Sequence, residues 1–79
     1  MDKNLMFTHH ELVRLFILCN AFKNRNQYDV YKYSGFVSDD PDKMECVGSI
    51  VDISKDNIEE MRVIIRKINK MLDGGFYNE

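Results

Sequence analysis

The stretch ISKDNIEEMRVIIRKINKMLDGG (residues 53–75) has the pattern of one amphipathic helix with a defined start and a defined end. Ser54 is a favourable N-cap residue, and Gly74-Gly75 supplies a left-handed stop. Acidic side chains gather near the start and basic ones near the end, which is the order that the helix dipole favours. The apolar residues recur at three- and four-residue steps, as Ile58, Met61, Ile65, Ile68 and Leu72. The sequence therefore predicts a C-terminal helix that buries one face.

A second helix is expected near the N-terminus, because Thr8-His9-His10-Glu11 fits a capping box. We expect it to run from about His9 to Lys23 and to end in the polar residues 24–27. Its predicted core stripe consists of Leu12, Leu15, Phe16, Cys19 and Phe22. Val13 and Ile17 are apolar on another side, so this helix needs cover on more than one face. Either the rest of the chain or another subunit provides that cover.

The region between these helices predicts a β-hairpin. Residues 28–37 and 44–53 are rich in aromatic and β-branched residues, and turn formers occupy residues 38–43. Neither strand alternates cleanly between apolar and polar residues, so the sequence does not show which face of the sheet is buried. Gly35 and Gly48 are expected at a bulge or at a close backbone approach. The predicted fold class is a two-layer α+β domain in the order α-β-β-α, with an antiparallel hairpin packed against both helices, forming a single small domain over residues 1–79.

Composition excludes several classes of protein. The net charge of −2 argues against a generic DNA-binding domain, and it is too small for a DNA mimic. Two cysteines cannot form the disulfide framework of a small secreted domain. No signal peptide is apparent, and the longest nearly apolar run, residues 12–22, is too short to span a bilayer. We therefore expect a cytoplasmic protein without a membrane partner, located in the host cytoplasm if the protein is viral.

No motif predicts catalysis, a cofactor or a metal. Adjacent residues such as His9, His10 and Glu11 diverge around a helix and cannot chelate one ion. The acidic loop 39–45 lacks the central glycine of a calcium loop. Cys19 and Cys46 show no sign of activation as nucleophiles. The chain is thus expected not to be an enzyme and to have no catalytic, cofactor-binding or metal-binding residues.

Aromatic and basic side chains instead suggest a recognition surface. Tyr28, Tyr31 and Tyr33 lie close together in the sequence, and tyrosine is enriched in interface hot spots. Aromatic residues on strands also occur in single-stranded nucleic-acid binders, but Lys32 is the only basic residue in these strands. Val63 could form the apolar centre of a basic patch. The candidate partner-binding residues are Val13, Ile17, Tyr31, Tyr33, Arg62, Val63, Arg66 and Lys70.

Two hypotheses about function follow. The first is a small non-enzymatic regulator or inhibitor that binds a larger protein and forms a homodimer or a higher homo-oligomer. Its size and its many Lys, Asn, Ile and Asp residues are compatible with a viral or mobile-element origin. The alternative is an oligomeric protein that binds a nucleotide-like anion in a pocket between subunits. Tyr31, Tyr33, Arg62 and Arg66 would line that pocket.

Overall fold

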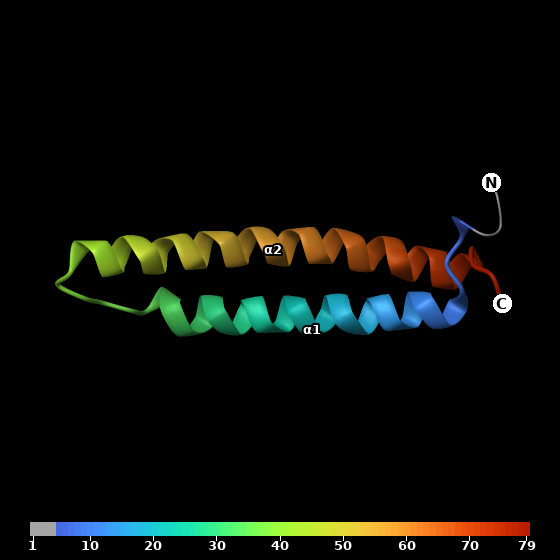
Figure 1. Ribbon diagram of the computed structural model, residues 1–79, viewed down its shortest axis with the longest axis horizontal. Helices are drawn as coiled ribbons and strands as arrows, with labels where there is room; N and C mark the ends of the chain where they lie inside the picture. Colours follow the sequence, from blue (N-terminus) through green and yellow to red (C-terminus); the bar gives the residue numbers. More distant parts are fainter. Residues whose placement is uncertain (1–4) are drawn as a thin grey trace.

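The structure is a computed structural model that describes residues 5–79, and it is an antiparallel pair of long helices (Figure 1). Helix α1 spans His9–Ser34 and helix α2 spans Pro41–Gly74, with residues 35–40 as the connecting loop. The molecule is a rod with extents of 56 × 19 × 14 Å. Residues 5–8, which precede α1, and residues 75–79, which follow α2, lie at the end of the rod opposite the loop (Figure 1).

The α+β prediction is wrong, because no strand occurs among residues 5–79. Residues 28–34 continue α1, and residues 44–53 form part of α2. Strand propensity differs between residue types by only about 1 kcal/mol, and packing context readily overrides it. Here Val47 and Val51 continue the apolar spacing of the C-terminal helix, so the helical arrangement partly buries them.

The predicted helix boundaries at Ser54 and at residues 24–27 are also wrong. Ser54 lies in the interior of α2 and is buried, so it is not an N-cap. Helix α2 begins thirteen residues earlier, at Pro41, where the Asp40 carboxylate accepts a hydrogen bond of 3.0 Å from the backbone N–H of Asp42. Residues 24–27 stay helical because buried Asn26 has a partner in α2. Gly35 follows the end of α1 and Gly48 lies within α2, so neither marks a bulge.

The predicted caps at the outer ends of the helices are confirmed. The Thr8 hydroxyl accepts from the backbone N–H of Glu11 at 3.0 Å, and the Glu11 carboxylate accepts from the backbone N–H of Thr8 at 2.9 Å. Gly75 adopts a left-handed conformation with φ 71°, which glycine tolerates without steric cost. These two signals depend only on neighbouring residues, so the sequence was sufficient to predict them.

The helices meet along an antiparallel seam with heptad spacing, which is the pattern of a coiled coil. In α1 the seam residues are Leu12, Phe16, Cys19, Lys23, Asn26, Val30 and Tyr33. In α2 they are Met44, Val47, Val51, Ser54, Ile58, Met61, Ile65, Ile68 and Leu72. All of them except Met44 are buried or half-buried. The apolar residues that are fully buried are few: Leu12, Ile58 and Ile68.

A polar layer interrupts this seam near its middle. Asn26 and Ser54 are both buried, and the side-chain amide of Asn57 donates to the Asn26 carbonyl oxygen at 3.1 Å. Asn26 uses its own amide to donate to the backbone carbonyl of Phe22 at 2.7 Å. A buried polar pair of this kind favours one register, because any slip leaves polar atoms unpaired.

At the end of the rod opposite the loop, the segment before α1 contacts the segment after α2. The backbone N–H of His9 donates to the carbonyl of Asn78 at 3.0 Å, and the N–H of Asn78 donates to the carbonyl of Phe7 at 2.9 Å. The rings of His9 and Tyr77 meet edge to face at 5.0 Å. These contacts tie residues 7–9 to residues 77–78 and limit fraying of both helices at this end.

Candidate interaction surface

The heptad register places every exposed side chain on a known side of the hairpin. With positions lettered a to g, Leu12 occupies d in α1 and Met44 occupies a in α2. The e and g positions flank the seam, and b, c and f lie farther out. Because the helices are antiparallel, the g positions of both helices lie on the same flank, and the e positions lie on the other.

The g flank is mainly apolar, and we call its apolar side chains the lateral stripe. The two polar g residues along the seam, Asp29 and Asn57, pair with Arg25 and Asn26 respectively. The lateral stripe combines g residues with the adjacent c residues Leu18 and Ile53. Its members are Leu15, Leu18, Phe22, Ile50, Ile53, Ile64 and Met71. Leu18 is 61% exposed and Ile53 is 60% exposed, and only Leu15 and Met71 are half-buried. The other five members stay exposed, although burying each would contribute about 1.5–3 kcal/mol.

The opposite flank is mainly polar. Its e residues are Val13, Asn20 and Gln27 in α1, and Gly48, Lys55, Arg62 and Asn69 in α2. The Arg62 guanidinium donates to the Glu59 carboxylate at 2.7 Å, and both side chains are largely exposed. Such an exposed ion pair contributes about 0–1 kcal/mol to stability. The hairpin is therefore asymmetric across its seam, with one apolar flank and one hydrated flank.

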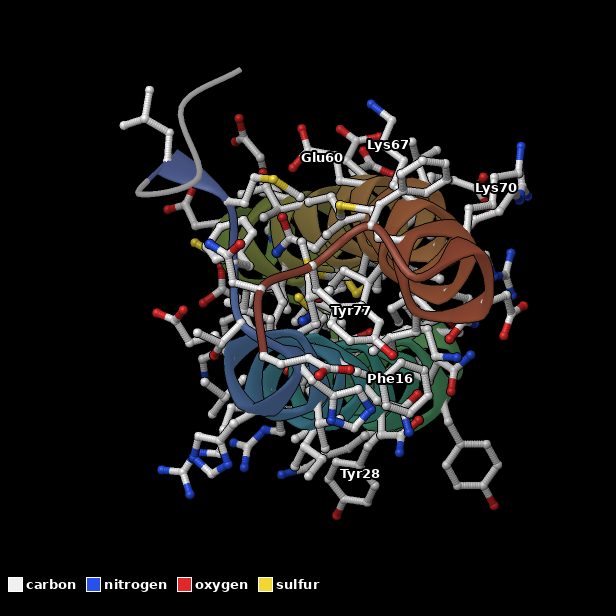
Figure 2. All side chains as sticks on the ribbon, turned by 90° about the vertical axis from the view of Figure 1, so that its right-hand side faces the viewer. Phe16, Tyr28, Glu60, Lys67, Lys70 and Tyr77 are labelled. Carbon is white, nitrogen blue, oxygen red and sulfur yellow. The ribbon has the colours of Figure 1, made fainter. Side chains whose placement is uncertain are left out.

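A second exposed row lies on the face of α1 that is directed away from α2, and we call it the outer stripe. It consists of the b and f residues Ile17, Ala21, Tyr28 and Tyr31. Ile17 is 56% exposed and Tyr31 is 84% exposed. Figure 2 looks along the rod and shows Tyr28 extending from α1 on the side opposite α2. This row offers both apolar and phenolic contacts to a partner.

The candidate residues from the sequence are divided among these surfaces. Ile17 and Tyr31 share the outer stripe, Val13 is half-buried on the polar flank, and Tyr33 belongs to the seam. The α2 candidates Arg62, Val63, Arg66 and Lys70 are all exposed, at e, f, b and f respectively. Lys70 extends from α2 on the side away from α1, as Lys67 and Glu60 also do (Figure 2). The structure thus brings Ile17 together with Tyr31, but it places the basic candidates on the other helix.

The four residues expected to line a ligand pocket are not adjacent within one chain. Tyr33 borders a hollow of about 320 Å³ that Val51 also lines, and Val51 precedes Arg62 by eleven residues. At 1.5 Å per residue, Arg62 lies about 16 Å farther along α2. Tyr31 is directed away from α2, because it occupies position b. A pocket between subunits built from these side chains stays a prediction.

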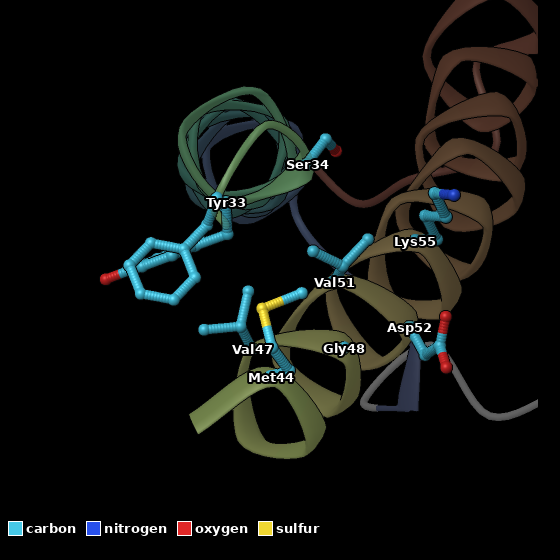
Figure 3. A pocket seen from close by; sticks show the side chains of 9 residues that line it. Tyr33, Ser34, Met44, Val47, Gly48, Val51, Asp52 and Lys55 are labelled. Atoms are coloured by element: carbon cyan, nitrogen blue, oxygen red, sulfur yellow. The ribbon is translucent and has the colours of Figure 1, made fainter. Parts of the chain in front are cut away.

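The hollow itself lies between the helices beside the connecting loop (Figure 3). Met44, Val47 and Val51 extend from α2 on the side near Tyr33, while Asp52 and Lys55 lie on the opposite side (Figure 3). Gly48 contributes to the opening, because it presents no side chain and a Cβ built there meets nothing within 4 Å. The feature is a shallow notch where the loop separates the helices.

The chemical groups that could react are dispersed. Among residues 5–79, no three His, Cys, Asp or Glu side chains are grouped so that they could hold a metal ion. Cys19 is half-buried in the seam, and Cys46 is exposed at position c of α2. The backbone N–H of Thr8, donating to the Glu11 carboxylate, lowers the pKa of that carboxyl, and the Thr8 hydroxyl acts in the same direction. This perturbation belongs to the helix cap.

Comparison with known proteins returned no matching protein-family model, curated protein or solved structure. Neither helix in residues 5–79 combines the length and the apolarity needed to cross a membrane. The surfaces described above are therefore the observations from which function is inferred.

The sequence interpretation missed most of the lateral stripe and the polar layer. Leu18 was not included in the core stripe predicted for the first helix, and Ile50 and Ile53 were assigned to a strand. The signal that would have revealed them is the unbroken alternation of four- and three-residue steps from Leu12 to Tyr33 and from Met44 to Leu72. Once both runs are followed, five of the seven g positions and the c residues Leu18 and Ile53 are found to be apolar on one flank.

Proposed function

We propose that this chain is a small non-enzymatic interaction protein, a regulator or inhibitor that binds a larger protein. The observation that carries the proposal is the imbalance between exposed and buried apolar residues. Among residues 5–79, fifteen large apolar or aromatic side chains are exposed, whereas three apolar residues are buried. Contiguous exposed apolar surface on a soluble protein generally marks a site of interaction.

The outer stripe is the surface that we assign to the larger partner. Tyr28 and Tyr31 lie in adjacent turns of α1, and Ile17 lies eleven residues before Tyr28, or about 16 Å along the axis. A helix commonly binds a groove through anchors repeated at such intervals. Tyrosine is well suited to this role, because its ring provides contact area while its hydroxyl stays hydrated or hydrogen-bonded. The expected partner surface is an apolar groove with polar edges.

The ligand-binding alternative has less support. Arginine beside aromatic rings would suit an anionic planar ligand. Within one chain, however, Arg62 lies about 16 Å along α2 from Val51, which lines the same hollow as Tyr33. No hollow described in residues 5–79 is lined by both an arginine and a tyrosine.

The test is affinity capture with the tagged chain in cells that naturally express it, followed by quantitative mass spectrometry. Ile17→Glu and Tyr31→Ser alter the outer stripe, and Gln27→Ser on the polar flank is the matched control. A specific partner is expected to be captured by the wild type and by Gln27→Ser, and to be lost with both outer-stripe variants. Its purified form should then bind the purified chain with the same dependence on these residues. A capture profile that is unchanged by Ile17→Glu and Tyr31→Ser would contradict the proposal.

A further inference from the structure

The isolated hairpin exposes more surface than a folded monomer of its mass should. A monomeric protein of 9.4 kDa is expected to expose about 5,000 Å², whereas this chain exposes 6231 Å². The excess is about 1,200 Å². A standard protein interface buries about 800 Å² on each partner. One interface of ordinary size would therefore remove most of the excess.

The lateral stripe is the surface on which such an interface fits best. It lies on one flank, draws residues from both helices, and extends from Met71 near one end of the rod to Ile50 toward the other. The opposite flank offers Lys55, Arg62 and Asn69, which are costly to bury without partners. Desolvation of the lateral stripe is favourable by comparison, because its members are apolar and the two polar g residues along this flank, Asp29 and Asn57, already have partners within the chain.

The dimensions of the stripe favour a second copy of the same chain as its occupant. A two-fold symmetric contact needs one patch that complements itself, and an apolar stripe along a straight rod meets this condition. Two rods of equal 56 Å length can pair along their whole extent and form a four-helix bundle. The charged c positions beside the stripe include Arg25 and Lys32 in α1 and Glu60 and Lys67 in α2. Asp29 at g pairs with Arg25, so both signs of charge are present for pairing between copies. The net charge of −2 adds little repulsion.

We propose that two copies of this chain associate through the lateral stripe and form a four-helix bundle in which Leu18, Phe22, Ile53 and Ile64 become core residues. The outer stripe of each copy stays exposed in this assembly, since b and f positions lie on the other side of α1. The dimer would therefore present two equivalent copies of the outer stripe. Its formation does not depend on the larger partner.

Neighbouring residues of α1 provide a matched pair of variants. Leu18 belongs to the lateral stripe and Ile17 to the outer stripe, and their exposed fractions are similar, at 61% and 56%. Sedimentation equilibrium of the wild type at micromolar concentration is expected to give twice 9.4 kDa. Leu18→Glu removes two buried side chains per dimer and is expected to raise the dimer dissociation constant by about a hundredfold or more. Ile17→Glu is expected to leave that constant within about threefold of the wild-type value.

The wild type alone provides a second measurement, which covers the case in which Leu18→Glu unfolds. The midpoint of thermal unfolding of a dimer rises with protein concentration, whereas that of a monomer does not. A rising midpoint together with the dimer mass supports the proposal. A mass of 9.4 kDa with a constant midpoint overturns it, and so does equal loss of dimer in Ile17→Glu and Leu18→Glu. If the outer stripe does not bind the larger protein, Ile17→Glu retains both the dimer and the captured partner. That result is distinct from loss of the dimer.

Discussion

The side-chain amide of Asn57 in α2 donates a hydrogen bond of 3.1 Å to the side-chain carbonyl oxygen of Asn26 in α1. The two residues are 31 positions apart in the sequence, and Asn26 is only 5% exposed. Ser54, also buried, lies one turn of α2 from Asn57. A seam made only of apolar residues tolerates slippage, so this polar pair is the feature that specifies how the helices align.

The Asn26–Asn57 pair should show measurable coupling. In a double-mutant cycle with Asn26→Ala and Asn57→Ala, each single variant removes the same hydrogen bond. The loss in free energy of unfolding of the double variant should therefore be smaller than the sum of the losses of the two single variants. We expect a coupling energy of about 0.5–1.5 kcal/mol, the usual net contribution of one such bond. Urea denaturation of the four proteins at one fixed protein concentration measures it. Additive losses would show that the bond does not contribute to stability.

Gly48 and Gly75 should respond to alanine in opposite directions. Gly48 lies inside α2 with open space around its Cα, so Gly48→Ala should increase stability by about 0.5–1 kcal/mol through the higher helix propensity of alanine. Gly75 has φ 71°, a left-handed conformation that costs alanine about 1–2 kcal/mol. Gly75→Ala should therefore destabilise the protein. Thermal unfolding monitored by circular dichroism measures both changes, and a fall in the midpoint for Gly48→Ala would show that Gly48 has a packing role.

The capping box at Thr8 should make the start of α1 sensitive to acid. The backbone N–H and the hydroxyl of Thr8 lower the pKa of the Glu11 carboxyl below its ordinary value of 4.5. A lowered pKa in the folded state means that the cap stabilises the protein fully above pH 4.5 and that this stabilisation is lost as the pH falls through the folded-state value. Titration of the Glu11 side chain by NMR should show the lowered pKa in the wild type and a partial return toward 4.5 in Thr8→Ala, which removes the hydroxyl but keeps the backbone N–H.

Glu11→Gln is the control for this effect. Glutamine can accept the same hydrogen bond from Thr8 but does not titrate, so the stability difference between this variant and the wild type should shrink as the pH falls below 4.5. A Glu11 pKa at its ordinary value of 4.5 in the wild type would mean that the carboxylate does not engage the cap in solution.

Local signals in the sequence predicted the two outer helix ends. The helical state of residues 24–34 and 44–54 depends instead on pairing between the two helices. The Thr8–Glu11 box and the Gly75 stop each involve residues within one turn, so they can be recognised without the fold. Asn26 resembles a turn residue when it is read alone, but in the folded chain it is buried against Asn57. Tyr28 and Val47 belong to residue types that favour strands when each is read alone. In the folded chain they occupy heptad positions of α1 and α2.

The candidate surface was predicted only in part. Ile17 and Tyr31 were selected from apolarity and residue type, and they share the outer face of α1. The lateral stripe could not be recognised while residues 44–53 were assigned to a strand, because alternation along a strand places Ile50 and Ile53 on opposite faces. On a helix the same two residues are three positions apart and lie on one face.

The most direct test of the exposed apolar flank is an isotope-filtered NOE experiment on an equimolar mixture of ¹³C-labelled and unlabelled chains. Contacts between copies should appear at the methyl groups of Leu18, Ile53 and Ile64, and those of Ile17 should show none. Intermolecular NOEs at these lateral-stripe methyls would place a second copy of the chain on this flank. Their absence from all three residues at a concentration well above micromolar would contradict the dimer and leave the flank without its proposed occupant.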